Sequence, residues 1–335
     1  MHDTIDRRQF LALAGLGGAV FASGLAGFSG SAAAAKQDFF FVQVTDTHWG
    51  YKGPANPEAA NTLQKAVAVV NALEATPDFI VFTGDLTHTT DDGKERRRRL
   101  AEFRDIVAKL KVKDVKFMPG EHDAALDRGA AYQEFFGPLN YAFDHKGVHF
   151  IGMNSILVPD FWTKAGLSPE QRRDWFMPLN SPVPGVWGTD ERQREWLKKD
   201  VARLPASTPI VIFTHSPLWD YYPRWNFQVS DSKEIRATLA KFTSVMAFHG
   251  HVHHTVYNKI GNLTSIGTMS TSWPWPYPPV KLPYPDFQQY RADPGNTADG
   301  MGTATIAITG SGTGTMQYAP FAESVPQRLV NGFKI

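Results

Sequence analysis

The chain has 335 residues, with 34 Lys and Arg, 33 Asp and Glu, and a formal net charge of +1. This balance gives no charge-based reason to expect nucleic acid or an anionic membrane as a partner. Cysteine is absent from the sequence, which excludes disulfides, thiolate-bound zinc, iron–sulfur clusters and cysteine nucleophiles. Because eleven histidines are present, a metal bound by this chain would be held by His, Asp, Glu or Asn.

Residues 1–35 have the pattern of an export signal. Arg7 and Arg8 precede a Gly- and Ala-rich apolar stretch, which ends in the small residues 31–35. This order is typical of a cleaved signal peptide, and the arginine pair resembles a twin-arginine (Tat) signal. A Sec signal and a membrane anchor are the alternatives, but the weakly apolar stretch disfavours a stable membrane span. We expect export by the Tat machinery, to the periplasm or as a secreted protein, with residues 36–335 forming a single domain.

The remaining chain alternates short apolar runs with helical patterns. Runs rich in aromatic and β-branched residues predict buried strands, and apolar residues at helical spacing predict helices. The expected strands are residues 39–44, 78–82, 115–118, 149–154, 209–213 and 244–248, and the expected helices are residues 61–74, 94–109 and 189–204. Thr alternates with apolar residues over 301–319, which predicts further strands. The whole pattern indicates an α/β fold with parallel strands.

Acidic residues or histidines follow five of these strands. They are Asp46 and His48, Asp85, Glu121 with His122 and Asp123, His215, and His251 with His253. Because ligands of parallel sheets bind outside the carboxyl ends of the strands, we expect these side chains to meet in one crevice. In extended backbone, residues two positions apart also face the same way. Seven oxygen and imidazole donors exceed the needs of one tetrahedral ion and suit a pair of ions ~3.5–4 Å apart, as in phosphatases and nucleases.

The ordered set of motifs resembles the calcineurin-like metallophosphoesterase superfamily. The motifs are Asp46-x-His48, Gly84-Asp85, Gly120-x-His122-Asp123, His215 and Gly250-His251-x-His253. The bacterial cyclic-nucleotide and glycerophosphodiester phosphodiesterases are the most similar group, and the fold type is shared with purple acid phosphatases. The resemblance implies a four-layer α/β/β/α sandwich, with the strands of 301–319 completing the second sheet. It also implies a cofactor of two divalent or trivalent metal ions, either Mn, Fe or Zn.

The resemblance further implies a role for each residue of the set. The first metal would be held by Asp46, His48 and His253, and the second by Glu121, His215 and His251. Asp85 would bridge the two ions, which would activate a water molecule for attack on phosphorus. His122, as an imidazolium, would contact the phosphate and protonate the leaving oxygen. Asp123 would orient His122, as carboxylates commonly do for imidazoles.

Glu121 departs from the family pattern, which has Asn at this position. The carboxylate adds one negative charge, so it should hold a cation more tightly and favour a harder or more highly charged ion. It should also weaken the attraction of the metals for an anionic phosphate. Three outcomes stay open: an enzyme with another metal preference, an enzyme with another substrate, and a catalytically silent metal-binding relative.

Three other features have two interpretations each. His88 is a candidate for substrate contact, or a loop histidine bonded to the backbone. The loop 273–294 is rich in Pro and aromatic residues, which excludes helix and central strand; it lines a substrate pocket or packs over the sheet edge. The arginine run 96–99 lies beside Glu95 and Glu102 in an expected helix, so a solvated face is favoured over a basic binding patch.

The sequence therefore predicts an exported phosphoesterase with two metal ions, acting on a small-molecule phosphoester, with phosphodiesters preferred. A phosphomonoesterase or nucleotidase is the alternative among enzymes, and the silent metal-binding protein is the alternative outside them. The near-neutral net charge of +1 means that an anionic substrate would be attracted by local metal ions rather than by the field of the whole protein.

Overall fold

A computed structural model describes residues 37–53, 55–56, 58–156, 187–220, 227–274, 301–308 and 314–321. The predicted signal segment, residues 1–35, lies outside these residues, as does the predicted aromatic loop from residue 275 onward. Among the helices of the described residues, none is both long enough and apolar enough to cross a membrane.

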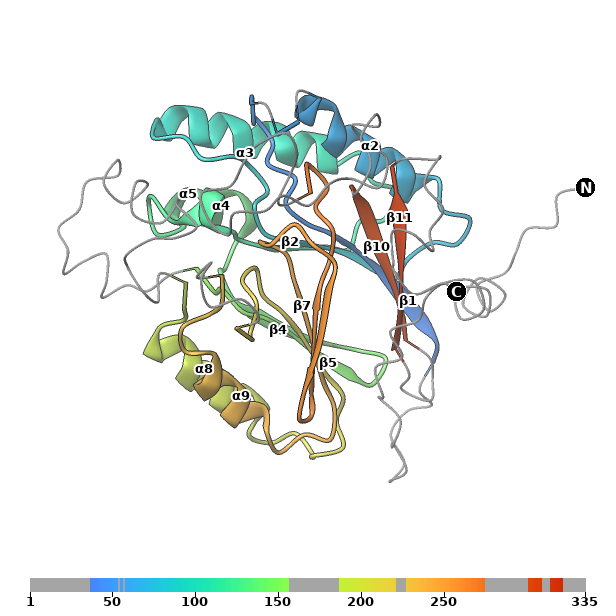
Figure 1. Cartoon of the computed structure of the whole chain (residues 1–335), viewed down its shortest axis with the longest axis vertical. Coiled ribbons are helices and arrows are strands. Elements are labelled where there is room, and N and C mark those ends of the chain that lie inside the picture. Colours follow the sequence, from blue (N-terminus) through green and yellow to red (C-terminus); the bar gives the residue numbers. More distant parts are fainter. Residues whose placement is uncertain are drawn as a thin grey trace, which may run out of the picture.

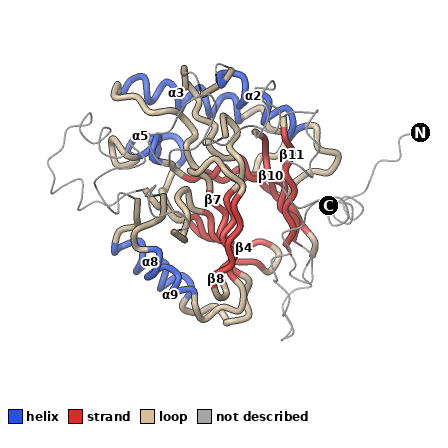
Figure 2. The backbone as a smooth tube through the Cα atoms, in the orientation of Figure 1, coloured by secondary structure: helices blue, strands red, loops and turns tan. Residues whose placement is uncertain are grey.

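Two sheets form the centre of the fold (Figures 1 and 2). Their strands are β1 Phe39–Val44, β2 Phe79–Thr83, β3 Val115–Met118, β4 Tyr141–His145, β5 Val148–Gly152, β6 Ile210–Phe213, β7 Val245–His249, β8 Val256–Ile260, β9 Leu263–Gly267, β10 Gly302–Ile308 and β11 Gly314–Pro320. Over the described residues, one sheet has five strands in the order β11-β10-β1-β2-β3, and the other has six in the order β4-β5-β6-β7-β9-β8. Each sheet has a parallel centre, β1-β2-β3 or β5-β6-β7-β9, with antiparallel strands added beside it.

Helices cover the outer face of each sheet. The helices are α2 Ala59–Asn71, α3 Gly93–Val107, α4 Glu121–Ala124, α5 Ala130–Phe136, α8 Glu191–Val201 and α9 Ser232–Leu239. In Figure 1, α2 and α3 lie above the five-stranded sheet, and α8 and α9 lie below the six-stranded sheet. The predicted four-layer α/β/β/α sandwich is therefore confirmed.

The space between the two sheets is filled by aromatic side chains. Successive residues of a strand point to opposite faces, so Phe39 and Phe41 of β1 join the core between the sheets, whereas Val42 and Val44 pack toward α2 and α3. The Phe41 ring stacks on Phe79 of β2 with 4.8 Å between ring centroids. Burial on both faces explains why these strands are continuous apolar runs in the sequence.

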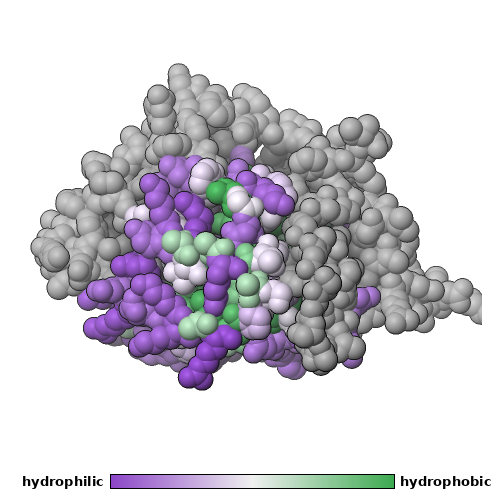
Figure 3. All heavy atoms as spheres, turned by 90° about the horizontal axis from the view of Figure 1, so that it is seen from below, coloured by the Kyte–Doolittle hydropathy of each residue, from purple (hydrophilic) through white to green (hydrophobic). Residues whose placement is uncertain are grey.

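The outer helices are amphipathic. Leu197 and Val201 of α8 and Ile235 and Leu239 of α9 are buried against the six-stranded sheet, and each such side chain contributes roughly 1.5–3 kcal/mol when fully buried. The face that Figure 3 shows, seen from below, carries mainly hydrophilic side chains around a small apolar group. The helices therefore close the core on one side and meet solvent on the other.

Side-chain caps explain where two predicted helices begin. The helix expected over 94–109 begins at Gly93, because the Asp92 carboxylate accepts from the backbone N–H groups of its first turn. The helix expected over 189–204 begins at Glu191, because Asp190 accepts from the N–H of Gln193 at 2.7 Å.

Several short elements were missed from sequence. They are α5, α9, strand β4 and the hairpin of β8 and β9. The side chains of β8 are only partly buried or exposed, and α9 spans 8 residues. Segments this short have too few residues for a clear period, even where they are buried as β9 is, so sequence periodicity does not find them.

Candidate metal centre

The seven predicted metal-binding residues meet at the carboxyl ends of strands from both sheets. Their ligand atoms fall into two groups, each with all atoms within 4.8 Å of one another: Asp46, His48 and His253 in one, and Asp85, Glu121, His215 and His251 in the other. The loops after β1, β2, β6 and β7 and the start of α4 supply them. The structure thus brings together residues more than 200 positions apart in sequence, such as Asp46 and His253.

Asp85 lies between the two groups. Its Oδ2 is 3.5 Å from Nε2 of His48 and 3.3 Å from Nε2 of His215. Across the cluster, Oδ1 of Asp46 is 3.4 Å from Nε2 of His253 and 3.9 Å from Nε2 of His215. One carboxylate oxygen is therefore placed where it can be shared by two adjacent ions.

Two motif glycines allow the strand ends to approach this closely. Gly84 has a φ of +99°, and a Cβ added there would lie 2.2 Å from Nδ1 of His215. A Cβ added at Gly120 would lie 2.1 Å from Oδ1 of Asp85. Any larger residue at either position would push a donor out of the cluster, so both glycines are required by contact across the site, and Gly84 also by its positive φ.

Five of the seven donors have left-handed backbone conformations. They are Asp46 (φ 53°), His48 (42°), Asp85 (49°), His251 (69°) and His253 (51°). The expectation that extended backbone aligns the i and i+2 side chains is therefore wrong; tight turns direct them instead. Such conformations cost of order 1–3 kcal/mol each and occur where the surroundings enforce them. Here the N–H of Asp46 donates to Gly84 O at 3.1 Å and that of His48 to Asp85 O at 2.9 Å.

Backbone carbonyls fix the protons of two imidazoles. Nδ1 of His215 lies 2.7 Å from the carbonyl of Thr83, and Nδ1 of His253 lies 2.7 Å from the carbonyl of Trp273. A carbonyl oxygen only accepts, so each Nδ1 carries a proton and Nε2 is the ring nitrogen directed into the cluster. This is how imidazoles are commonly oriented for metal binding.

Buried polar atoms of Glu121 and of two imidazoles face each other in the second donor group. Oε2 of Glu121 is 2.9 Å from Nε2 of His215, and Oε1 is 2.9 Å from Nδ1 of His251. Glu121 Oε2, His215 Nε2 and both ring nitrogens of His251 are buried without a hydrogen-bond partner. Unpartnered buried polar groups are costly, and a bound cation would give these carboxylate and imidazole atoms a common partner. The donor set therefore fits a bound metal.

Burial and neighbouring charges define the electrostatics of the cluster. Burial lowers the pKa of His48 well below its usual value, which keeps the ring in the neutral form that binds metal. Burial and the nearby Glu121 carboxylate raise the pKa of Asp85. Burial opposes the ionisation of Glu121, yet His251 and His215 hold the pKa of this carboxyl well below its usual range. Three carboxyl groups share one buried space, so a bound cation would relieve their mutual repulsion.

His122 lies beside the cluster with one nitrogen already occupied. Its Nδ1 accepts from the backbone N–H of Thr89 at 3.2 Å and lies 2.5 Å from the Thr89 hydroxyl. Its Nε2 is 3.9 Å from Oδ2 of Asp85. Burial lowers the pKa of His122 to about 4, so the ring is neutral near pH 7 and its proton lies on Nε2, directed to the cluster. The expected imidazolium is thus replaced by a neutral donor.

The prediction that Asp123 orients His122 directly is wrong. One carboxylate oxygen of Asp123 accepts from Leu86 N at 2.9 Å and from Gly120 N at 3.0 Å. The other accepts from Thr87 N at 2.9 Å and from the Thr87 hydroxyl at 3.1 Å. Asp123 therefore fixes the loop that carries Asp85. The direct partner of His122 is Thr89, which sequence reasoning missed because only the tertiary fold brings the two together.

His88 contacts site residues rather than standing apart in its loop. Its Nδ1 is 3.2 Å from Nδ1 of His48, and its ring stacks on that of His122 at 4.6 Å. Trp273 stacks on His48 at 4.4 Å, and Tyr51 contacts both Trp273 and His88 at 4.3 and 4.8 Å. These rings form an aromatic wall beside the first donor group. Tyr51 carried no sequence signal, whereas Trp273 is the first residue of the predicted aromatic loop.

The interpretation of the arginine run as a solvated face is only partly right. Arg97 and Arg98 are exposed. Arg96 is buried and pairs with Asp127 at 2.9 Å. Arg99 donates to the carbonyls of His88 and Thr89 at 2.9 and 3.3 Å. Part of the run therefore holds the loop that carries the partner of His122.

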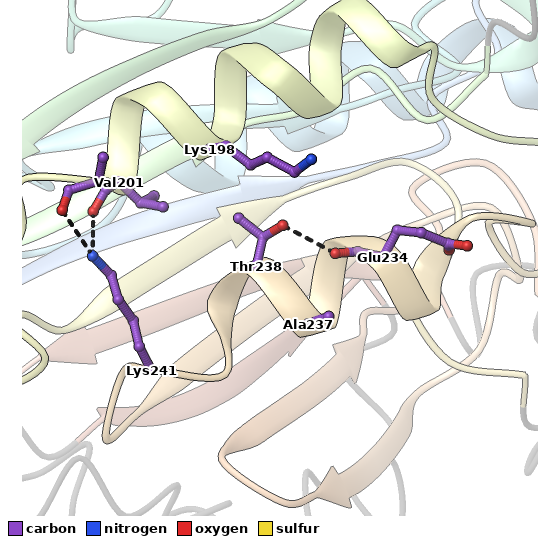
Figure 4. A pocket seen from close by; sticks show the side chains of 7 residues that line it. Lys198, Val201, Glu234, Ala237, Thr238 and Lys241 are labelled. Carbon is purple, nitrogen blue, oxygen red and sulfur yellow. Dashed lines mark hydrogen bonds between the residues drawn. The ribbon is translucent and has the colours of Figure 1, made fainter.

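A groove also lies between α8 and α9, away from the strand ends (Figure 4). Lys198, Glu234, Thr238 and Lys241 are among its lining residues. Nζ of Lys241 donates to the carbonyl of Val201 at 2.7 Å, and the Thr238 hydroxyl donates to the carbonyl of Glu234 at 3.0 Å. These polar groups are satisfied within the helices, in contrast to the unpartnered atoms of the metal cluster.

Seven converging donors at the strand ends of an α/β/β/α sandwich match the arrangement used by hydrolases that work with two metal ions. The chain belongs to the calcineurin-like phosphoesterase family, whose sequence model matches residues 41–255. This confirms the resemblance found in the motifs. The protein is accordingly a metal-dependent hydrolase of phosphoric ester bonds.

Individual relatives agree with this assignment. The chain is 27% identical over 238 residues to a probable glycerophosphodiester phosphodiesterase of Arcobacter nitrofigilis, covering 67% of this chain and 76% of that protein. It is 24% identical over 260 residues to the mouse serine/threonine-protein phosphatase CPPED1, covering 69% and 74%. A dimetal phosphatase from Danio rerio superposes with a TM-score of 0.55 at 16% identity, covering 84% of this chain and 95% of that one. This last similarity supports the fold alone.

Proposed function

We propose that this hydrolase is an exported phosphodiesterase that works with two bound ions of Mn, Fe or Zn. The observation that carries the proposal is the cluster of seven donors in two adjoining groups, with Asp85 between the groups and Nε2 of His122 facing it. Two bound ions would polarise the phosphoryl group and supply a water nucleophile at neutral pH.

The protein's own residues would hold and orient the reacting groups. Asp46, His48 and His253 form one binding group, and Glu121, His215 and His251 form the other, with Asp85 shared. The Nε2–H group of His122 would donate a hydrogen bond to a phosphoryl oxygen or to the leaving oxygen, stabilising the negative charge that develops there. Thr89 keeps that proton on Nε2, because its backbone N–H occupies Nδ1. Asp123 acts indirectly, through its bonds to the backbone of Leu86 and Thr87.

Two observations support a preference for diesters. The first is the aromatic wall of Tyr51, His88 and Trp273 beside the first donor group, since apolar and aromatic linings accommodate organic substituents. The second is the similarity to the probable glycerophosphodiester phosphodiesterase. His88 would face the substituent of the ester, because with Nδ1 directed to His48 its Nε2 is free to contact substrate.

Export through the Tat machinery, to the periplasm or beyond the cell, is part of the same proposal. It is supported by Arg7 and Arg8 ahead of a weakly apolar stretch that ends in small residues. A reporter fused after residue 35 gives a direct measurement. We expect export that depends on the Tat system and is lost in the Arg7→Lys, Arg8→Lys double variant; export that persists in a Tat-deficient strain would contradict the proposal.

Turnover of bis-aryl and mono-aryl phosphate esters tests the catalytic proposal. Protein free of metal is loaded with Mn²⁺, Fe²⁺ or Zn²⁺, and kcat/KM is measured for both esters at each loading. We expect the diester to have the higher kcat/KM. A higher value for the monoester would favour a phosphomonoesterase, which the similarity to CPPED1 keeps as the second candidate. Absence of turnover of both esters at every loading would overturn the proposal.

A further inference from the structure

Glu121 gives the two halves of the cluster the same kinds of donor. The first half has Asp46, His48 and His253, and the second has Glu121, His215 and His251. Asp85 Oδ2 lies at nearly equal distance from both halves, 3.5 Å from His48 Nε2 and 3.3 Å from His215 Nε2. Each half therefore owns one carboxylate and two imidazoles, with one further carboxylate shared.

The Asn of the family pattern would leave the halves unequal. Its amide is neutral, so the second half would have two imidazoles and no carboxylate of its own, while the first half kept Asp46. A half with one more negative charge binds a divalent cation more tightly, and the other would be filled second. Glu121 removes this difference in charge.

The geometry shows that the Glu121 carboxylate is placed to do this. It is buried at the start of α4, with 7% of its surface exposed. Its two oxygens are each 2.9 Å from a different imidazole of its own half, Oε2 from His215 and Oε1 from His251. Oε2 of Glu121 has no hydrogen-bond partner, and Nε2 of His215, opposite to it, has none either. The extra methylene of Glu, compared with Asn or Asp, lets the carboxylate reach both imidazoles. The NH₂ group of an amide only donates, so it could not replace either oxygen as an acceptor.

We propose that Glu121 balances the charge of the two half-sites, so that the centre binds two ions of the same divalent metal with similar affinity. The inference rests on the proposed metal centre and goes beyond it, because it concerns the order and selectivity of loading. The first and second ions should bind within roughly 10-fold of each other. Replacing the Glu121 carboxylate by a neutral amide should weaken the binding of one of the two ions by at least about 10-fold, since the loss of an outer partner of a metal ligand alone costs about 10- to 100-fold.

Metal stoichiometry and affinity test the proposal without any measurement of turnover. Metal-free protein is titrated with Mn²⁺ by calorimetry, and bound Mn is counted by elemental analysis after equilibrium dialysis. The variants are Glu121→Gln, which keeps the size of the side chain, Glu121→Asn, which restores the family residue, and Asp46→Asn, which removes the matching charge from the other half. We expect two ions per wild-type chain, and one tightly bound ion in each variant.

The outcomes separate this inference from the proposed function. Wild-type affinities that differ by more than 100-fold would overturn the inference, and so would a folded Glu121→Gln variant that binds both ions as wild type does. The wild-type measurement stands alone if a variant fails to fold. Two equal ions in a protein that hydrolyses no phosphoester would support the inference while overturning the function, since binding and turnover are measured separately.

Discussion

The five-stranded and six-stranded sheets supply different chemistry to the same cluster. The five-stranded sheet provides every carboxylate donor and one imidazole, namely Asp46, His48, Asp85 and Glu121, whereas the six-stranded sheet provides His215, His251 and His253. The acidic side of the centre therefore lies on one sheet, and the side made only of imidazole donors lies on the other.

This division means that neither sheet forms the centre alone. Three buried carboxyl groups on one sheet repel each other, and the imidazoles of the other sheet reach them only when the sheets are docked. Direct bonds hold this edge together: Nδ1 of His215 donates to Thr83 O at 2.7 Å, and the N–H of His251 donates to Oδ1 of Asp46 at 3.0 Å. The sheets are joined by an aromatic core in the middle and by polar contacts at the site.

Removal of metal should have the largest effect, because it removes the ions that the donors of both sheets would share. We expect chelation to abolish phosphoester turnover and to lower the thermal midpoint. Metal that binds only the folded state contributes about 2.7 kcal/mol when its concentration is a hundred times its Kd. Turnover and thermal unfolding are measured before chelation, after it, and after addition of Mn²⁺.

The variant Asp85→Asn provides the matched comparison, because it removes the carboxylate that both halves share. Chelator should lower the thermal midpoint of Asp85→Asn much less than that of wild type. The control variant Asp105→Asn, an exposed change on α3, should lose as much of its midpoint on chelation as wild type does. An unchanged midpoint for chelated wild-type protein would show that the sheets do not depend on metal.

His122→Ala should have the second largest effect, and only on chemistry. Loss of one positioned hydrogen-bond donor to developing negative charge costs about 10²–10³-fold, and the loss should be greatest for esters with a poor leaving group, on which the most charge develops. The dependence of kcat on leaving-group pKa is the measurement, with bound metal counted as a control. A variant that retains its metal and wild-type rates on alkyl esters would show that the proton on Nε2 has no role.

The sequence predicted the donors better than it predicted what orients them. Asp46, Asp85 and His215 follow apolar runs recognisable as strands, and parallel strands bring such ends together, so the cluster was accessible from pattern. The roles of Thr89 and Tyr51 could not be predicted from the sequence, because their positions depend on how a loop folds back across neighbouring elements. Asp123 shows the same limit, since its acidic character was evident but its backbone partners were not. A helix as short as α9 carries too weak a period to be found.

Thr89→Val should have a smaller effect, confined to the orientation of His122. The change keeps the shape and the backbone N–H but removes the hydroxyl that lies 2.5 Å from Nδ1. A single hydrogen bond is worth about 0.5–1.5 kcal/mol, so we expect a decrease in kcat of about 2–10-fold on poor leaving groups, with little change for activated aryl esters. Thr89→Ser should restore the rate. A uniform loss on all esters would indicate a structural role instead.

Lys241→Ala should have the smallest effect, a slight loss of folding stability with no change in turnover. Nζ of Lys241 donates to the carbonyls of Val201, Ala202 and Leu204 at 2.7, 3.1 and 3.2 Å, so it caps the C-terminal end of α8 beside the groove of Figure 4. A cation at a helix C-terminus is worth about 0.3–1 kcal/mol, and denaturant unfolding should register a loss of that size. Lys198→Ala, which removes a pair with Glu195 on the exposed face of α8, is the matched control and should change stability even less. The donors of both sheets lie at the strand ends, away from the outer helices. A change in kcat/KM for Lys241→Ala would therefore mean that the outer helix layer takes part in the reaction, which would contradict the division of chemistry between the two sheets.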